Sequence, residues 1–117
     1  MELTTFLQRL NEAPASVAFS DTIAIIDAQY GFAPAAFKNG SLFNEAGQNN
    51  GSCKIFSFAR MHGLSEQQTL HCFGDYYRKD VLGNPGGGDH QNIRNFMKTG
   101  WAGIAFDSDA LVGPKHA

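Results

Sequence analysis

Apolar residues spaced three or four positions apart divide the N-terminal part of the chain into short helices. The first pattern predicts an amphipathic helix, ended by Asn11 and Pro14, with one apolar face made of Leu3, Phe6, Leu7 and Leu10. Ser20 or Asp21 is expected to cap a second helix, which Gly31 would stop in a left-handed conformation. The buried face of this second helix is predicted to carry Ile23, Ile26 and Tyr30.

The same spacing continues in the middle of the chain. Residues 53–62 are apolar on most sides, which favours a buried helix, although a weak alternation also fits a strand. Ser65 and Gln68 form a capping box that opens a longer helix, which is expected to run without a break to Gly83. Its buried stripe is predicted to comprise Leu70, Phe73, Tyr77 and Val81.

The last predicted helix begins after a loop of three glycines at 86–88. Asp89 is expected to cap it, and its buried stripe is predicted to be Ile93, Phe96 and Met97. Gly100 at a left-handed position would then return Trp101 to the side chain of Phe96.

Strand patterns are few, and they gather around one turn. Asn39 and Gly40 both tolerate positive φ, and with Phe37 and Leu42 on either side they predict a β-hairpin. Residues 103–106 read as a further strand that can pair with the hairpin, whereas the glycine- and asparagine-rich residues 44–52 read as a loop. The sequence therefore predicts an α+β fold, with about five helices on a small antiparallel sheet. Residues 1–117 would form one compact domain whose tail is loose after about residue 111.

Charge and composition narrow the classes of function. Charged residues make up 17% of the chain, the net charge is −2, and no basic stripe is present, which argues against nucleic-acid binding. No apolar run approaches the roughly 18 residues of a membrane span, and the N-terminus does not resemble a signal peptide. Cys53 and Cys72 are expected to be free thiols of a cytoplasmic protein. The sequence does not set the oligomeric state.

Residues 44–54 are the first candidate site. Ser52 and Cys53 fall near a predicted helix N-terminus with Lys54 beside them, an arrangement that suits an anion. The alternative is that Asn44, Asn49 and Ser52 only satisfy backbone groups in turns, and the sequence favours this structural explanation.

Cys53 is also considered as a nucleophile, because a thiol at a helix N-terminus can have a lowered pKa. His62, His71 or His90 would have to act as its base. The chain is much shorter than papain-like cysteine proteases, which its Gly-Ser-Cys run faintly resembles, and packing explains a small cysteine equally well. No catalytic residue is therefore assigned.

The polar start of the last helix is the other candidate site. His90 and Arg94 lie four residues apart and are able to hold a carboxylate or a phosphate together. The alternative is that Asp89 caps the helix while its polar neighbours anchor the glycine loop. No pair of histidines or cysteines has metal-ligand spacing, so neither a metal nor a cofactor is expected.

Several segments together resemble one family. NEAGQNNGSCKIF at 44–56, FGDYYR at 73–78, and DHQNIRNFM at 89–97 followed by Gly100 and Trp101 are similar to the HopJ-type family of type III effector proteins. Residues 30–32 and 37–40 extend the resemblance over nearly the whole chain. It implies delivery from a bacterium into plant host cells by type III secretion, but it carries over no catalytic residue. An apolar helical face that begins at Leu3 instead favours an ordered start, unlike the flexible N-termini usual for such export.

Two functional hypotheses follow. The first is a non-enzymatic protein-interaction module of the HopJ type that binds a host or bacterial protein, with Tyr76 as the candidate surface aromatic. The second is a small enzyme or anion- or ligand-binding protein. The candidate residues for the second hypothesis are Asn44, Glu45, Asn49, Ser52, Cys53, Lys54, His90 and Arg94.

Overall fold

The computed structural model describes residues 1–114. This part of the chain contains five α-helices: α1 Leu3–Glu12, α2 Phe19–Gln29, α3 Asn50–Met61, α4 Glu66–His71 and α5 Gln91–Thr99. Shorter helical turns are η1 Pro14–Ser16, the π-helix η2 Tyr76–Val81, and η3 Gly100–Gly103. The strands are β1 Gly31–Phe32, β2 Phe37–Asn39, β3 Leu42–Asn44, β4 Ile104–Phe106 and β5 Leu111–Val112. The predicted α+β class and the single compact domain are confirmed.

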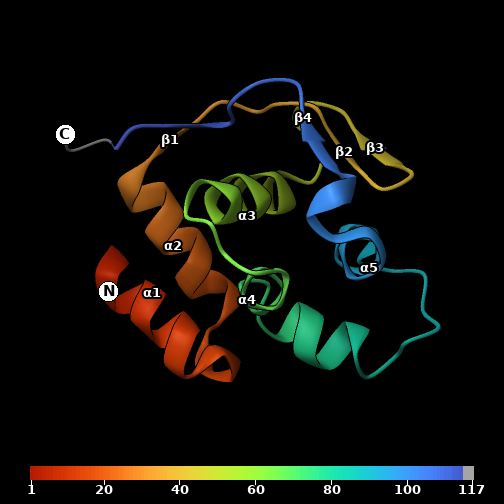
Figure 1. Ribbon diagram of the computed structural model, residues 1–117, viewed down its shortest axis with the longest axis horizontal. Coiled ribbons are helices and arrows are strands. Elements are labelled where there is room, and N and C mark those ends of the chain that lie inside the picture. Colours follow the sequence, from red (N-terminus) through yellow and green to blue (C-terminus); the bar gives the residue numbers. More distant parts are fainter. Residues whose placement is uncertain (115–117) are drawn as a thin grey trace.

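Helix α3 lies in the middle of the molecule, with the strands along one side and the other helices around it (Figure 1). Six of its residues are buried: Cys53, Ile55, Phe56, Ser57, Phe58 and Ala59. A helix enclosed on most sides is apolar on most sides, which explains why its sequence shows no narrow amphipathic stripe. The predicted helix over 53–62 is confirmed, and it begins three residues earlier than expected.

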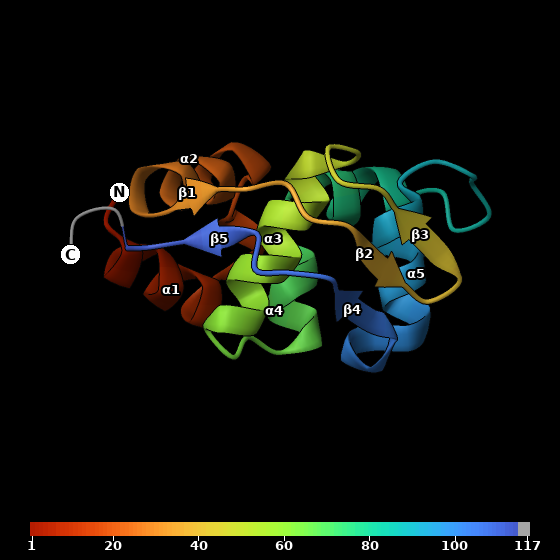
Figure 2. The ribbon, with the colours of Figure 1, turned by 90° about the horizontal axis from the view of Figure 1, so that it is seen from above.

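Two antiparallel sheets form one long ribbon above α3 (Figure 2). In the three-stranded sheet β2 pairs with both β3 and β4, as the hairpin signal and the residues before Phe106 predict. The turn itself is Gly40–Ser41, because Asn39 pairs with Leu42 and is still part of β2. Gly40 supplies the positive φ of +62° that this tight turn requires.

The second sheet, β1 with β5, was not indicated by the sequence, because two-residue strands are too short for an alternating pattern. Main-chain hydrogen bonds from Ala33 to Ala110 and from Asp107 to Ala36 connect it to the three-stranded sheet. The tail was predicted to be loose after about residue 111, but Val112 still pairs with Gly31 in this sheet. Residues 115–117, the end of that predicted tail, lie outside the described residues.

The predicted helix from Ser65 to Gly83 is wrong as one continuous element. Its capping box is present, with the Gln68 amide donating to Ser65 Oγ and the Ser65 amide donating to Gln68 Oε1, both at 3.0 Å. However, α4 ends at His71, and Gly74 adopts a φ of +61° before the π-helix begins. The backbone of Gly74 packs so closely against the start of α2 that a Cβ would lie 2.5 Å from the Phe19 nitrogen. The apolar spacing nevertheless survives the break: Leu70, Phe73, Tyr77 and Val81 are all buried.

Several predicted helix ends also differ from the structure. Helix α2 begins at Phe19, so its N-cap is Ala18 and neither Ser20 nor Asp21. Asp21 lies in the first turn, where its side chain accepts a hydrogen bond from the Ala18 amide. Gly31 is part of β1 and has no positive φ. Met97 is 45% exposed, so it is not part of the buried stripe of α5.

The end of α5 agrees with the prediction. Gly100 has a φ of +57°, and the rings of Trp101 and Phe96 form a T-shaped contact with ring centroids 5.2 Å apart.

A Gly74→Ala substitution is expected to destabilise the protein by about 2 kcal/mol or more, since it adds backbone strain and a clash with α2. Urea denaturation measures this loss in the free energy of unfolding. Gly86→Ala is the matched control, because Gly86 has no positive φ and no atom within 4 Å of an added Cβ. Equal stability of the two variants would show that the break between α4 and η2 does not depend on Gly74.

Candidate functional site

Four asparagine side chains connect the β2–β3 hairpin to α5. We call Asn39, Asn44, Asn49 and Asn92 the asparagine cluster. The amides of Asn44 and Asn92 donate to each other's Oδ1 atoms, at 3.1 and 2.9 Å. Asn39 Nδ2 donates to the main-chain oxygen and Oδ1 of Asn92, and Asn49 Nδ2 donates to Asn44 Oδ1 at 2.7 Å. Asn44 and the amide nitrogen of Asn49 therefore have a structural role in this arrangement.

Two residues with left-handed backbone begin the two helices that meet at this cluster. Asn49, with φ of 51°, precedes α3, and His90, with φ of 48°, precedes α5. They are the non-glycine residues with positive φ within 1–114. The predicted capping of α5 by Asp89 is therefore wrong, because the chain turns into the helix one residue later, at His90.

Neither Asn49 nor His90 caps its helix with a side chain. The first intrahelical hydrogen bonds are donated by the amides of Cys53 and Arg94. The amides of residues 50–52 and 91–93 consequently have no acceptor inside their helices.

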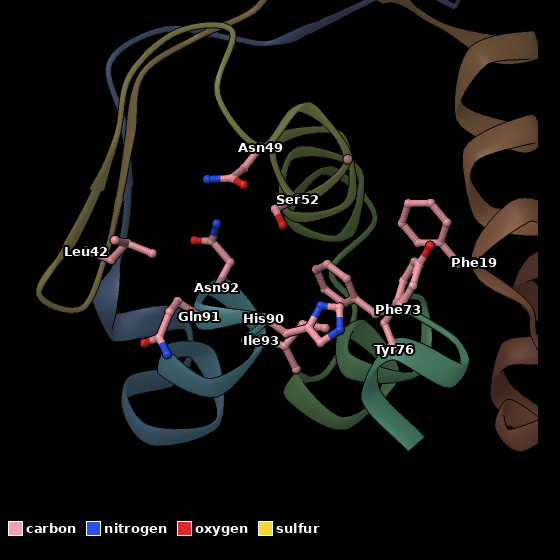
Figure 3. A pocket seen from close by; sticks show the side chains of 11 residues that line it. Phe19, Leu42, Asn49, Ser52, Phe73, Tyr76, His90, Gln91, Asn92 and Ile93 are labelled. Atoms are coloured by element: carbon pink, nitrogen blue, oxygen red, sulfur yellow. The ribbon is translucent and has the colours of Figure 1, made fainter. Parts of the chain in front are cut away.

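An open cleft with a volume of about 460 Å³ lies between these two helix N-termini. Figure 3 shows Asn49 and Ser52, from the start of α3, facing His90 and Asn92, from the start of α5. The polar lining residues are Asn49, Gly51, Ser52, His90, Gln91 and Asn92. The remaining lining is apolar or aromatic: Phe19, Leu42, Phe73, Tyr76 and Ile93. This composition resembles that of small-molecule sites, in which a few polar groups orient a ligand against an apolar wall.

His90 is held at the edge of the cleft by an acidic and an aromatic neighbour. Its Nε2 lies 3.1 Å from Asp80 Oδ2 and 3.8 Å from Asp89 Oδ2. Its ring lies 5.2 Å from the ring of Tyr76, which in turn contacts Phe19 edge-on at 5.0 Å. Tyr76 remains 44% exposed. The predicted surface position of Tyr76 is therefore confirmed.

The predicted residues Cys53, Lys54 and Glu45 do not line the cleft. Cys53 is buried, and its Sγ donates to the Ala35 oxygen at 3.6 Å. Burial raises the pKa of the Cys53 thiol more than this hydrogen bond lowers it, so the neutral thiol is favoured. Lys54 pairs with Asp27 at 2.8 Å, and the main chain of Glu45 forms a turn with Gln48.

Cys72, the second predicted free thiol, is also free and buried, and burial raises its pKa to about 12. A thiolate nucleophile needs the opposite environment, with nearby positive charge and access to solvent.

Arg94 is directed away from His90. Its guanidinium donates to the main-chain oxygens of Asp89, Asn84 and Pro85, and to Asp89 Oδ1 at 2.6 Å. These contacts hold the glycine loop before α5 and keep the pKa of Asp89 below its usual range. Arg94 lines a different hollow, beside Met97 and Leu82, so His90 and Arg94 do not face a common ligand.

Sequence reasoning missed the aromatic side of the cleft. Phe73 reads as a core residue, and no local pattern indicates that Phe19 and Phe73 line the same cleft as His90. Asp80, the partner of His90, precedes it by ten residues across a loop whose path the sequence does not reveal. Of the aromatic residues in the cleft, only Tyr76 was indicated by the sequence, because its position in the helical pattern predicted an exposed side chain.

The chemistry available in the cleft is hydrogen bonding beside aromatic rings. Ser52 Oγ, Asn49 Oδ1 and Gln91 Oε1 have no hydrogen-bond partner within residues 1–114. The same part of the chain contains no group of three or more side chains placed to hold a metal ion. None of its helices has the length and apolarity needed to cross a bilayer.

Asn44→Ala and Asn92→Ala are each expected to cost about 1–3 kcal/mol of stability, because each leaves buried amide groups unpaired. The double variant should lose less than the sum of the two, since the reciprocal pair is already broken by either change. Urea denaturation of the four proteins gives the coupling energy. Asn11→Ala, at an exposed position of α1, is the control and should stay within about 0.5 kcal/mol of the parent. Additive losses at Asn44 and Asn92 would contradict their cooperation.

Comparison with known proteins gives one family and one solved structure. A crystal structure described as that of the protein of unknown function VPA0580 is 52% identical, with a TM-score of 0.95, over 97% of this chain and 94% of that chain. A search of curated proteins gives no match. The family described as HopJ type III effector protein matches residues 3–111. Since that match covers nearly the whole chain, the protein belongs to the HopJ type III effector family.

Proposed function

We propose that this protein acts by binding a host or bacterial protein, and that the cleft between α3 and α5 is part of the contact site. Membership of a type III effector family supports this role, and delivery into a host cell from the bacterial cytoplasm is part of the same proposal. The observation that carries it is the position of Tyr76. This exposed ring lines both the cleft and a second hollow of about 610 Å³, which is also lined by residues 15–20 with Asp75, Arg78 and Asp80.

Tyrosine is one of the residue types enriched among those that dominate binding energy at protein interfaces. Tyr76 is already oriented by Phe19 and His90, so little side-chain entropy is lost when a partner covers it. Two of the residues considered for catalysis do not face the cleft: Cys53 is buried, and Arg94 is bonded to the glycine loop. This distribution favours binding over catalysis.

A second function, binding of a small anionic or amide-bearing ligand, is favoured by one specific observation. Two helix N-termini open on the same cleft, and their free amides and dipoles attract acceptor groups. Asn49, Ser52 and His90, three of the residues expected from the sequence, would contact such a ligand directly. Asn44 would act through the asparagine cluster.

The protein-binding proposal is tested by photocrosslinking from the cleft. With p-benzoylphenylalanine in place of Tyr76, we expect a specific adduct in host or bacterial extracts, because this side chain would contact the partner. The same group in place of Lys38, an exposed residue on the outer face of β2, should give none. Unlabelled protein should compete for the adduct, whereas Tyr76→Ala should compete about tenfold less well. Equal adducts from both positions, or equal competition by Tyr76→Ala, would count against the cleft as the contact site.

The ligand-binding proposal is tested by titration with inorganic phosphate, followed by NMR. The amide signals of Gly51, Ser52, Asn92 and Ile93 should shift together and saturate, since their N–H groups would donate to the anion. The amide of Gly86, outside the cleft, serves as the control. Shifts that do not saturate, or that are as large at Gly86, would rule out a specific anion site.

A further inference from the structure

The sequence contains two asparagine–glycine pairs, Asn39–Gly40 and Asn50–Gly51. In such a pair the glycine main-chain nitrogen is able to attack the carbonyl carbon of the asparagine side chain, because no Cβ hinders its approach. The reaction requires an accessible side chain, a glycine N–H that is free of strong hydrogen bonds, and a backbone that opens locally. The two pairs differ in each of these respects.

In Asn39–Gly40 the fold restrains both groups that would have to react. Asn39 is fully buried, and its amide donates to two oxygens of Asn92 at 2.7 and 3.0 Å. The Gly40 N–H donates to the Gly103 oxygen at 3.0 Å. Both reacting groups are engaged, and Asn39 belongs to β2, the central strand of the three-stranded sheet.

Asn50–Gly51 is open to reaction. Asn50 is exposed, and its side chain has no hydrogen-bond partner within residues 1–114. Gly51 is the second residue of α3, so its N–H precedes the first intrahelical hydrogen bond, which Cys53 donates. Since Asn49 provides no side-chain cap, the first turn of α3 opens at a smaller cost than a capped turn would.

We propose that Asn50 is a site of spontaneous deamidation, whereas Asn39 is protected. The Gly51 nitrogen forms a bond to Asn50 Cγ, its proton passes to water, and the side-chain nitrogen leaves as ammonia. Water then opens the cyclic imide at either carbonyl, which gives aspartate or isoaspartate at position 50. The net reaction consumes one water and releases one ammonia, and no oxidant or reductant is needed.

The two products change the cleft in different ways. Aspartate places a negative charge on the first residue of α3, where the helix dipole stabilises it. Isoaspartate routes the main chain through the side-chain carbon, which lengthens it by one atom and disrupts the first turn. Gly51 and Ser52 line the cleft, so either product alters its edge. A resulting change in ligand or partner binding rests on the proposed function, but the modification itself does not.

The test is incubation of the folded, full-length protein at mildly alkaline pH, followed by proteolysis and mass spectrometry. Deamidation raises a peptide's mass by about one dalton. Conversion at Asn50 should be at least about tenfold faster than at Asn39, which corresponds to a difference of about 1.4 kcal/mol in local opening. Chromatography separates the aspartate and isoaspartate peptides, and both should appear.

Two controls keep the comparison decisive. In strong denaturant the pairs should react at similar rates, because only the fold distinguishes them. Asn50→Gln should abolish fast conversion in the folded protein and leave Asn39 unreactive. Equal rates at Asn39 and Asn50 in the folded protein, or no conversion at Asn50 while the denatured chain reacts, would overturn the proposal. Neither readout depends on binding, so the result is separate from that of the crosslinking and phosphate experiments.

Discussion

The reciprocal hydrogen bonds between the side chains of Asn44 and Asn92 fix the geometry on which the rest of the site depends. They join the end of the hairpin to the first turn of α5, two parts of the chain separated by 48 residues. Both amides are removed from water, so each must have a partner to avoid a desolvation cost. This requirement sets the position of α5 relative to the hairpin. Through Asn49, it also sets where α3 begins.

Local patterns in the sequence were sufficient for α1, α2, α3 and α5, for the hairpin and for the third strand. The capping box at Ser65, the turn at Gly40 and the Trp101–Phe96 contact all depend on residues that are close in sequence. Features that depend on distant contacts could not be predicted in this way. Gly74 interrupts the helix predicted from Ser65 to Gly83 where the backbone at the start of α2 lies against it, and β1 pairs with β5, which is distant in sequence.

The same division applies to the candidate site. The sequence indicated that residues 44–54 and the start of the last helix are polar clusters, and the fold brings parts of both to one cleft. It did not indicate which side chains point there. His90, which has a left-handed backbone, lines the cleft, whereas Arg94 donates to the carbonyl groups of the preceding loop. Spacing along a helix cannot predict that division, since both side chains were expected on one face.

The ribbon that covers α3 has a consequence for the order in which the protein assembles. Residues 31–39 pair with residues 104–112, so this cover is completed only after nearly the whole chain has left the ribosome. Contacts so far apart in sequence form late, because closing a long loop costs entropy before any contact stabilises it. Until then the central helix exposes an apolar side to the cell. Conversely, removing either residues 31–39 or residues 104–112 from the ribbon would expose that helix. Any export machinery that threads an unfolded chain would have to break the main-chain hydrogen bonds between these two segments.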